Sequence, residues 1–256
     1  MNRQKSAVEI SRLQFGFENT LVFRDLTLNI PEFSRCLLLG ANGIGKSTLL
    51  RVLAGKHLVR ADSVKIFGED PFSGNLGVHD VTLVAERFPF NLDVSVEELL
   101  QRQRASQEVK TELLELLQID LAWRMHRVSN GQRRRVDLLL SFLNSPRLVL
   151  LDEVTSDLDI LSRQRLLRWL KSKAIKRQMT TVFATHILDG MEDWATHLAF
   201  LSPVGLSGEG ATLRTMGVLK RNKDFIEAKK KHPKAPLLWL CEKWLKEDER
   251  AAVKKN

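Results

Sequence analysis

The sequence lacks the features that mark several classes of protein. Its 256 residues include only two cysteines, Cys36 and Cys241, which form no disulfide framework and favour a reducing compartment. No run approaches the roughly 18 apolar residues that cross a bilayer, and the segment MNRQKSAVEI lacks the apolar stretch of a secretory signal. The sequence contains no H-x-x-x-H pair, the spacing that would indicate a metal site on a helix. We therefore expect a globular protein of the cytoplasm, with the nucleus as an alternative.

Positive charge is concentrated near the C-terminus. The formal net charge is +9, and residues 220–256 hold 12 Lys/Arg against 6 Asp/Glu. This excess is either a solvated surface or the footprint of nucleic acid or another acidic partner. No RNA-binding motif accompanies the charge, so both interpretations stay open.

A glycine-rich stretch, GANGIGKST, lies between an apolar run and a segment with helical spacing. Strand, glycine-rich turn and helix form the context of the phosphate-binding loop G-x-x-x-x-G-K-[ST]. Its backbone N–H groups can converge on phosphate oxygens, with Lys46 at the β- and γ-phosphates and Ser47 on Mg²⁺. The sequence therefore predicts a nucleoside triphosphate site. Its expected binding residues are Gly40, Ala41, Asn42, Gly43, Ile44, Gly45, Lys46, Ser47 and Thr48.

Two acidic residues, Asp152 and Glu153, follow the apolar run at 148–151. The run predicts a buried parallel strand whose C-terminal end lies beside the phosphate loop. There Asp152 is expected to hold the hydration shell of Mg²⁺, and Glu153 to face a water that attacks the γ-phosphate. His186 follows another buried strand expected at 180–184, where it is either an ordinary histidine or a γ-phosphate contact.

Alternating apolar residues predict further strands, at 7–15, 21–30, 64–68, 81–85 and 198–201. Phe15 ends the first of these segments and Phe17 follows it. Their rings either pack in the core or stack on a nucleotide base. Glu86 comes just after the strand expected at 81–85. It lies either in the crevice where α/β sheets bind ligands or on a surface loop.

Residues 93–146 show helical spacing of apolar residues and predict a helical insert in the α/β core. The stretch VSNGQ interrupts it, and Ser129 or Asn130 is expected to cap the helix that follows. With Gly131, Ser129 also forms an anion-binding nest, so a second phosphate contact is the alternative. Near the C-terminus, residues 235–250 predict an amphipathic helix that either packs on its own domain or docks a partner.

Taken together, these motifs resemble the nucleotide-binding domain of the ATP-binding-cassette (ABC) superfamily. The resemblance covers residues 7–210 and rests on GANGIGKST, VSNGQ, LVLLDE and the Thr-His pair at 185–186. VSNGQ is similar to the ABC signature LSGGQ, which ordinary phosphate-loop enzymes lack. The family implies an α/β fold of the P-loop NTPase class, with a RecA-like core, an antiparallel β subdomain and a helical signature subdomain. The expected domains are a core at 1–92 and 147–210, a helical subdomain at 93–146 and a basic helical extension at 211–256.

The resemblance also implies a mechanism and its cofactors, ATP and Mg²⁺. Two such domains pair head to tail, as a homodimer here, with each ATP between the phosphate loop of one copy and the signature of the other. The implied catalytic residues are Lys46, Glu153 as general base and His186 on the γ-phosphate, and the implied metal ligands are Ser47, Asp152 and Glu86. Phe17 (or Phe15) is implied to stack on adenine, and Ser129 and Gly131 to act from the opposite subunit.

The chain departs from the family pattern at three positions. Glu86 stands at the place of the Q-loop glutamine, where it adds negative charge near the γ-phosphate, Val154 replaces a proline, and Asp157 replaces the alanine of the D-loop. VSNGQRRRVDLLL and DEVTSDLD are similar to a branch of soluble ABC ATPases that includes plant class-I members and a yeast factor associated with mRNA deadenylation. That resemblance implies an ATP-driven switch on a regulatory protein assembly. The alternatives are the ATPase subunit of a split membrane transporter and a nucleic-acid-binding module.

Overall fold

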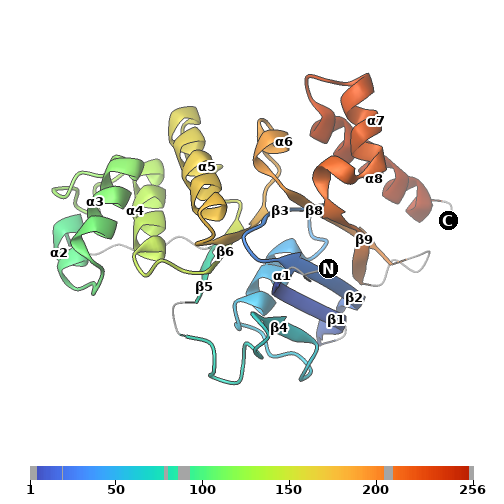
Figure 1. Ribbon diagram of the computed structural model, residues 1–256, viewed down its shortest axis with the longest axis horizontal. Coiled ribbons are helices and arrows are strands. Elements are labelled where there is room, and N and C mark those ends of the chain that lie inside the picture. The colour runs from blue at the N-terminus through green and yellow to red at the C-terminus, as the bar shows by residue number, and fades with distance from the viewer. Residues whose placement is uncertain (1–4, 19, 78–79, 86–92, 205–209, 254–256) are drawn as a thin grey trace.

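The computed structural model describes residues 5–18, 20–77, 80–85, 93–204 and 210–253. Within these ranges one nine-stranded sheet has the order β4-β1-β2-β9-β8-β3-β7-β6-β5, with helices around it (Figure 1). Its strands are β1 Ser6–Phe17, β2 Thr20–Pro31, β3 Arg35–Gly40, β4 Val64–Ile66, β5 Val81–Val84, β6 Leu148–Asp152, β7 Thr180–Ala184, β8 His197–Pro203 and β9 Ala211–Val218. The helices are α1 Lys46–Leu53, α2 Val96–Gln101, α3 Gln107–Leu117, α4 Asn130–Phe142, α5 Ile160–Ile175, α6 Met191–Trp194, the 3₁₀ helix η1 Leu219–Arg221, α7 Lys223–Lys231 and α8 Pro236–Val253.

The centre of the sheet is parallel and one side of it is antiparallel. Strands β8, β3, β7, β6 and β5 run parallel to one another, whereas β1 pairs antiparallel with β2 and β4, and β8 with β9. A parallel strand covered on both faces requires a nearly continuous apolar sequence, which explains the apolar runs read in β3, β6 and β7. The arrangement confirms the expected α/β fold with its antiparallel side.

Successive residues of the central strands belong to two different cores. Leu38 and Leu150 join a cluster with α1 and the antiparallel strands, and their neighbours Leu39 and Leu151 join a cluster with the helices α2 to α8. This alternation follows from the period of two along a strand, which sends consecutive side chains to opposite faces. The sheet therefore holds α1 on one face, and α5 and α8 on the other.

The helices α2, α3 and α4 lie within residues 93–146, at one end of the molecule (Figure 1). Their apolar residues Val96, Leu113 and Phe142 are buried, as the helical spacing predicted. Serines cap all three helices, through capping boxes in α2 and α4. The division of the chain into a core, this helical part and an extension remains a prediction.

The C-terminal part differs from the helical extension expected at 211–256. Residues Ala211–Val218 form the strand β9 beside β8, because Ala211, Leu213 and Met216 contribute to the apolar cluster on one face of the sheet. The helical part then begins at η1. There α7 and α8 pack on each other and on the sheet, with Trp244 buried and edge-to-face on Phe200. The basic C-terminal segment is therefore folded onto its own domain as far as residue 253.

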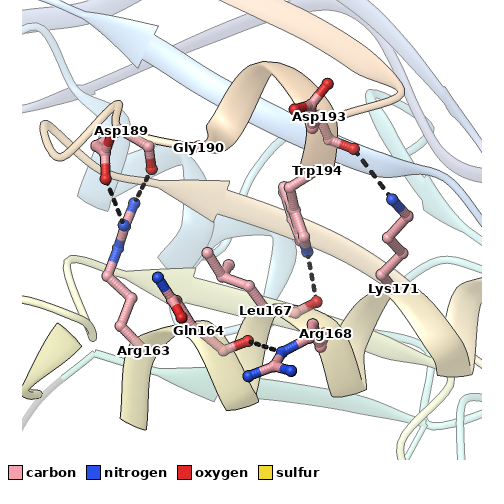
Figure 2. A pocket seen from close by; sticks show the side chains of 9 residues that line it. All are labelled: Arg163, Gln164, Leu167, Arg168, Lys171, Asp189, Gly190, Asp193 and Trp194. Atoms are coloured by element: carbon pink, nitrogen blue, oxygen red, sulfur yellow. Dashed lines mark hydrogen bonds and ion pairs between the residues drawn. The ribbon is translucent and has the colours of Figure 1, made fainter. Parts of the chain in front are cut away.

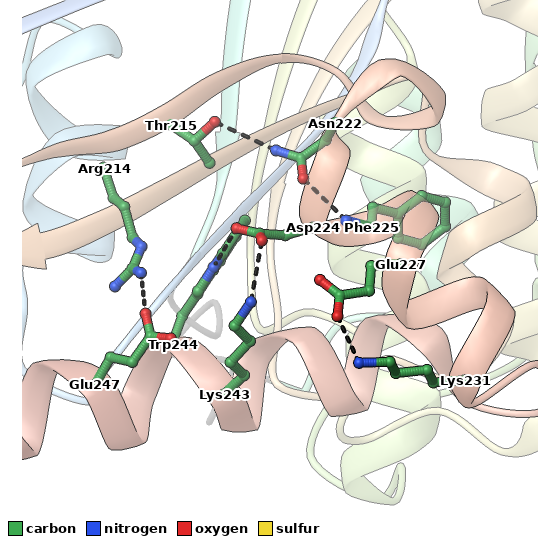
Figure 3. Close-up of polar contacts among 10 residues, drawn as sticks. All are labelled: Arg214, Thr215, Asn222, Asp224, Phe225, Glu227, Lys231, Lys243, Trp244 and Glu247. Atoms are coloured by element: carbon green, nitrogen blue, oxygen red, sulfur yellow. Dashed lines mark hydrogen bonds and ion pairs between the residues drawn. The ribbon is translucent and has the colours of Figure 1, made fainter.

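Paired charges hold α7 against α8 (Figure 3). One carboxylate oxygen of Asp224 accepts a hydrogen bond from Trp244 Nε1, and the other accepts one from Lys243 Nζ, both at 3.0 Å. Burial by itself raises the pKa of Asp224. The hydrogen bonds from Lys243 and Trp244 outweigh burial and keep that pKa below its usual value. Arg214 of β9 binds Glu247 and Asp248 of α8. The packing of the tail is thus apolar at its centre and ionic at its rim.

Candidate functional site

The phosphate loop lies between the end of β3 and the start of α1. Gly40 and Gly45 have φ angles of 145° and 107°, which residues with a side chain rarely adopt. A Cβ on Gly45 would lie 2.9 Å from the Phe23 ring and from Val22, and one on Gly40 would lie 2.6 Å from the Leu201 carbonyl oxygen. Glycine is therefore required at both positions, because β2 and β8 press directly on the loop.

Lys46, the first residue of α1, turns back over the loop. Its Nζ donates hydrogen bonds to the carbonyl oxygens of Gly40 and Ala41, each at 2.9 Å. Burial lowers the pKa of Lys46, while the negative charges of Glu153 and Asp152 act in the opposite direction. No side chain caps the N-terminus of α1, and its first turn holds no acidic residue. The helix end is thus available for an anion, with a lysine beside it.

The two predicted acids lie at the end of β6. Asp152 pairs with Ala184 of β7, and the Glu153 N–H donates to the Ala184 carbonyl oxygen at 2.9 Å. Glu153 has φ 51°, in the left-handed region that a non-glycine residue seldom occupies. The chain leaves the strand at that point, and the carboxylate turns toward His186. Backbone strain of this kind concentrates at functional sites.

His186 and Glu153 are in direct contact. The His186 Nδ1 lies 2.9 Å from Glu153 Oε2, and the His186 N–H donates to the same oxygen at 3.3 Å. The histidine is exposed and the glutamate half-buried, so this carboxylate is both held and accessible. The structure therefore brings together two residues that are 33 positions apart in the sequence and that follow neighbouring strands.

Arg163 of α5 holds the segment that follows His186. Its Nη2 donates to the carbonyl oxygen of Ile187 at 3.0 Å. The same nitrogen donates to the carbonyl oxygen of Asp189 at 2.8 Å (Figure 2). Arg163, Asp189 and Trp194 line a groove of about 400 Å³ between α5 and this segment (Figure 2). Burial lowers the pKa of Arg163. The sequence analysis missed this residue, because its contacts are to backbone carbonyls that no side-chain pattern announces.

Ser129 caps α4, as one of the two sequence interpretations predicted. Its Oγ accepts the Gln132 N–H at 3.2 Å, and its own N–H donates to Gln132 Oε1 at 2.8 Å. The serine is exposed, at the start of the longest helix of the helical part. The same hydroxyl and the helix N-terminus suit an anion brought from outside, which stays a prediction.

Gly131 touches the D-loop, residues 155–159. A Cβ at Gly131 would lie 2.9 Å from the Asp157 carbonyl oxygen, a backbone atom that must shift to admit it.

We expect Gly131→Ala to lower the free energy of unfolding by about 1–3 kcal/mol, because overpacking forces the backbone apart. Urea denaturation measures this change. Gly217→Ala is the control, since nothing lies within 4 Å of its added Cβ; equal losses in the two variants would contradict the role of the contact.

The aromatic residues near the phosphate loop form a small cluster. Phe17 is 47% exposed, and its ring centroid lies 5.1 Å from Phe15 and 5.3 Å from His57. Phe15 is half-buried against Phe23. Of the two candidates, Phe17 thus offers the open ring and Phe15 the packed one. Stacking of either on adenine remains a prediction, and His57 was missed by the sequence analysis.

The donors expected for Mg²⁺ are a hydroxyl and a carboxylate. Ser47, in the first turn of α1, and Asp152, at the end of β6, are both half-buried. Oxygen donors of this kind suit Mg²⁺, which keeps waters and phosphate oxygens in its shell and takes one or two carboxylates from a protein. The residues therefore fit that ion. Glu86, the third expected ligand, lies outside the described residues.

Known proteins are similar to this chain in sequence. The family model described as "ABC transporter" matches residues 23–156. "ABC transporter I family member 21" of Arabidopsis thaliana is 37% identical over 97% of this chain and 89% of its own length. "CCR4-associated factor 16" of Saccharomyces cerevisiae is 39% identical over 73% of each chain.

Solved structures share the fold. An ATP-binding subunit of an ABC transporter gives a TM-score of 0.76 at 21% identity, over 94% of this chain and 100% of that one. A dimeric ATP-binding cassette bound to ADP and phosphate gives 0.67 at 18% identity, over 83% and 98%. In the described part of this chain, no helix combines the length and the apolar character that a membrane span needs. From the matched family model and the two relatives, the chain belongs to the ABC family, alongside the Arabidopsis I-family members and the yeast factor.

Proposed function

We propose that this chain is an ABC-type ATPase that binds ATP and Mg²⁺ between two head-to-tail copies and hydrolyses the γ-phosphate. The observation that carries the proposal is the Glu153–His186 contact of 2.9 Å at the strand ends beside Lys46. General base, γ-phosphate contact and phosphate-binding lysine then lie at one edge of the sheet, where α/β folds bind their ligands. Membership of the family supports ATP as the nucleotide.

Each residue has a separate role in this reaction. Lys46 leaves the loop carbonyls that it now binds and pairs with the phosphates, and the N-terminus of α1 holds their charge. Glu153 accepts a proton from the attacking water, and His186 orients Glu153 and contacts the γ-phosphate. Ser47 and Asp152 would hold Mg²⁺, which when bound would supply positive charge to the phosphate oxygens.

The second half of the site is proposed to come from another copy of the chain. Ser129 and the N-terminus of α4 are exposed, and they present hydrogen-bond donors that serve an anion brought from outside. The dimeric cassette with ADP and phosphate has the same fold as this chain, which supports a dimer as the active form. ATP binding would then join two copies and hydrolysis would release them.

The biological role is proposed to be a switch on a regulatory protein assembly, in the cytoplasm or nucleus. The name of the yeast relative, "CCR4-associated factor 16", supports association with a protein assembly. The resemblance to the branch of soluble ABC ATPases suggests that the assembly is concerned with transcription or mRNA decay. The second candidate is the ATPase subunit of a split transporter. It is favoured by a 30% identity to the sulfate/thiosulfate import ATP-binding protein of Salmonella typhi, whose length the chain covers to 58%. The third candidate is nucleic-acid binding by residues 220–256, which hold 12 Lys/Arg against 6 Asp/Glu.

The test is nucleotide binding and oligomeric state of the purified chain. MgATP, but not MgADP, is expected to convert monomer into dimer in sedimentation experiments.

Lys46→Ala is expected to weaken ATP binding about 10- to 100-fold, because a charge-assisted bond to phosphate contributes about 1.5–3 kcal/mol. A wild-type chain that binds no ATP, or a Lys46→Ala variant with full turnover, would contradict the proposal. Specific co-purification with a multi-spanning membrane protein would favour the transporter subunit instead.

A further inference from the structure

A buried arginine of α4 faces an acid of the D-loop. Arg134 lies one helical turn after Gly131, with its Nε 3.6 Å from Asp157 Oδ2 and its Nη1 3.9 Å from Asp137 Oδ2. Arg134 and Asp137 are buried, and the Asp157 side chain is only 18% exposed. The acid is one of the departures noted in the sequence, since an alanine is usual there. Its counter-charge is thus supplied by α4, the helix that begins with the signature residues Asn130 and Gly131 and is called the signature helix below.

The geometry of the three charged residues Arg134, Asp137 and Asp157 contributes little to the stability of the fold. Within the described part of the chain, Arg134 Nε and Nη1 make no hydrogen bond, because their ion pairs of 3.6 and 3.9 Å exceed hydrogen-bond length. Desolvation of such charges offsets much of their attraction, and apolar residues of similar volume often serve a core equally well. Buried ion pairs instead fix one arrangement among several in the best-attested cases. The arrangement here is that of α4 against the D-loop.

Two further contacts extend the same junction. The Gly131 backbone lies so close to the Asp157 carbonyl oxygen that a Cβ would come within 2.9 Å of it. On the other side of the D-loop, Ser156 Oγ donates to the Glu153 carbonyl oxygen at 2.8 Å. A continuous path therefore runs from the signature helix, through Arg134 and Asp157, to the residue that carries the general base.

We propose that Arg134 is a positioning residue that ties the D-loop to the signature helix through Asp157, so that both meet the partner copy as one body. The proposal rests on the proposed function, in which the signature of one copy serves the ATP held by the other. Arg134 then connects the signature, which acts on the partner's ATP, with Glu153, which acts on the chain's own. Shortening of the 3.6 Å pair by about half an ångström would make it a charge-assisted hydrogen bond.

The experiment uses Asp157→Asn, which keeps the shape of the side chain and removes its charge. Hydrogen exchange of the D-loop amides, measured without nucleotide, is expected to become at least 10-fold faster. In a Glu153→Gln background, ATP-driven dimerisation is expected to weaken at least 10-fold, whereas binding of a fluorescent ADP analogue to the monomer changes less than 2-fold. Asp248→Asn is the matched control, because its side chain is 15% exposed and ion-paired with Arg214 of β9, and it belongs to α8 rather than to the D-loop or α4.

Arg134→Met removes the other partner of the pair. Because Arg134→Met alone removes a positive charge beside two acids and risks misfolding, it is combined with Asp137→Asn and Asp157→Asn, which leaves all three positions without formal charge. This triple variant is expected to fold and to dimerise as weakly as Asp157→Asn alone, since the link is already lost. Dimerisation at the wild-type level in either variant, or D-loop exchange unchanged in Asp157→Asn, would overturn the proposal. A chain that carries only Glu153→Gln could fail to dimerise on ATP while Asp157→Asn still makes D-loop exchange faster. In that case the proposed function would fail and the Arg134 link would stand.

Discussion

Replacing Glu153 with Gln is expected to lower ATP turnover at least 100-fold while ATP binding is kept. A general base contributes about 10²- to 10⁴-fold to a reaction, and glutamine has the shape of glutamate but cannot accept the proton. The structure supports a selective effect. The N–H of Glu153 remains bonded to Ala184, and the substitution changes the carboxylate contact with His186 and the negative charge that acts on Lys46.

The trapped ATP state gives the second readout of this variant. Because the nucleotide is bound but not cleaved, dimer is expected to accumulate on MgATP, as measured by light scattering behind a sizing column. Asp189→Asn is a suitable control, since its exposed carboxylate lies on the segment after His186 and is 4.0 Å from the nearest Arg163 nitrogen. A Glu153→Gln variant that keeps wild-type turnover would remove Glu153 from the role of base.

Trp244→Ala is expected to lower the free energy of unfolding by about 3–5 kcal/mol, the usual loss for a large aromatic side chain in a core. Trp244 is 1% exposed, packs on Phe200 of β8 and donates to Asp224 of α7. Its truncation leaves a cavity between α8 and the sheet and removes a hydrogen bond from a carboxylate. The expected result is detachment of α7 and α8 at lower denaturant concentration than in the wild-type chain.

Urea denaturation followed by circular dichroism measures the change. Leu238→Ala is the matched control, because Leu238 lies on the same helix but is 58% exposed, and its truncation is expected to change stability by about 0.5 kcal/mol or less. If both variants lost little stability, the C-terminal helices would be an appendage of the domain. The same packing means that deletion of residues 220–256 is no clean test of the basic charge, since it removes core residues.

Features with a local cause could be read from the sequence. The phosphate loop is specified by glycines at positions whose φ angles and neighbours exclude side chains, and the Ser129 cap is specified by a serine three residues before a glutamine. The strands β3, β6 and β7 were predicted because their apolar runs are continuous, as burial on both faces requires. The strand β9 was not predicted, because it reads as a weak mixture of small, polar and apolar residues and is placed by its pairing with β8.

The sequence by itself determined the phosphate loop, the acids after β6 and the signature turn, because each depends on residues within about ten positions of one another. Only the tertiary structure decided that Glu153 contacts His186, that Arg163 holds the segment beyond it, and that Asp157 faces Arg134. These contacts join residues from 23 to 33 positions apart. The Glu153–His186 contact arises because the parallel strands β6 and β7 bring their carboxyl ends to one edge of the sheet. The two arginine contacts arise because α5 and α4 lie beside the segments that follow those ends, a placement that no local pattern contains.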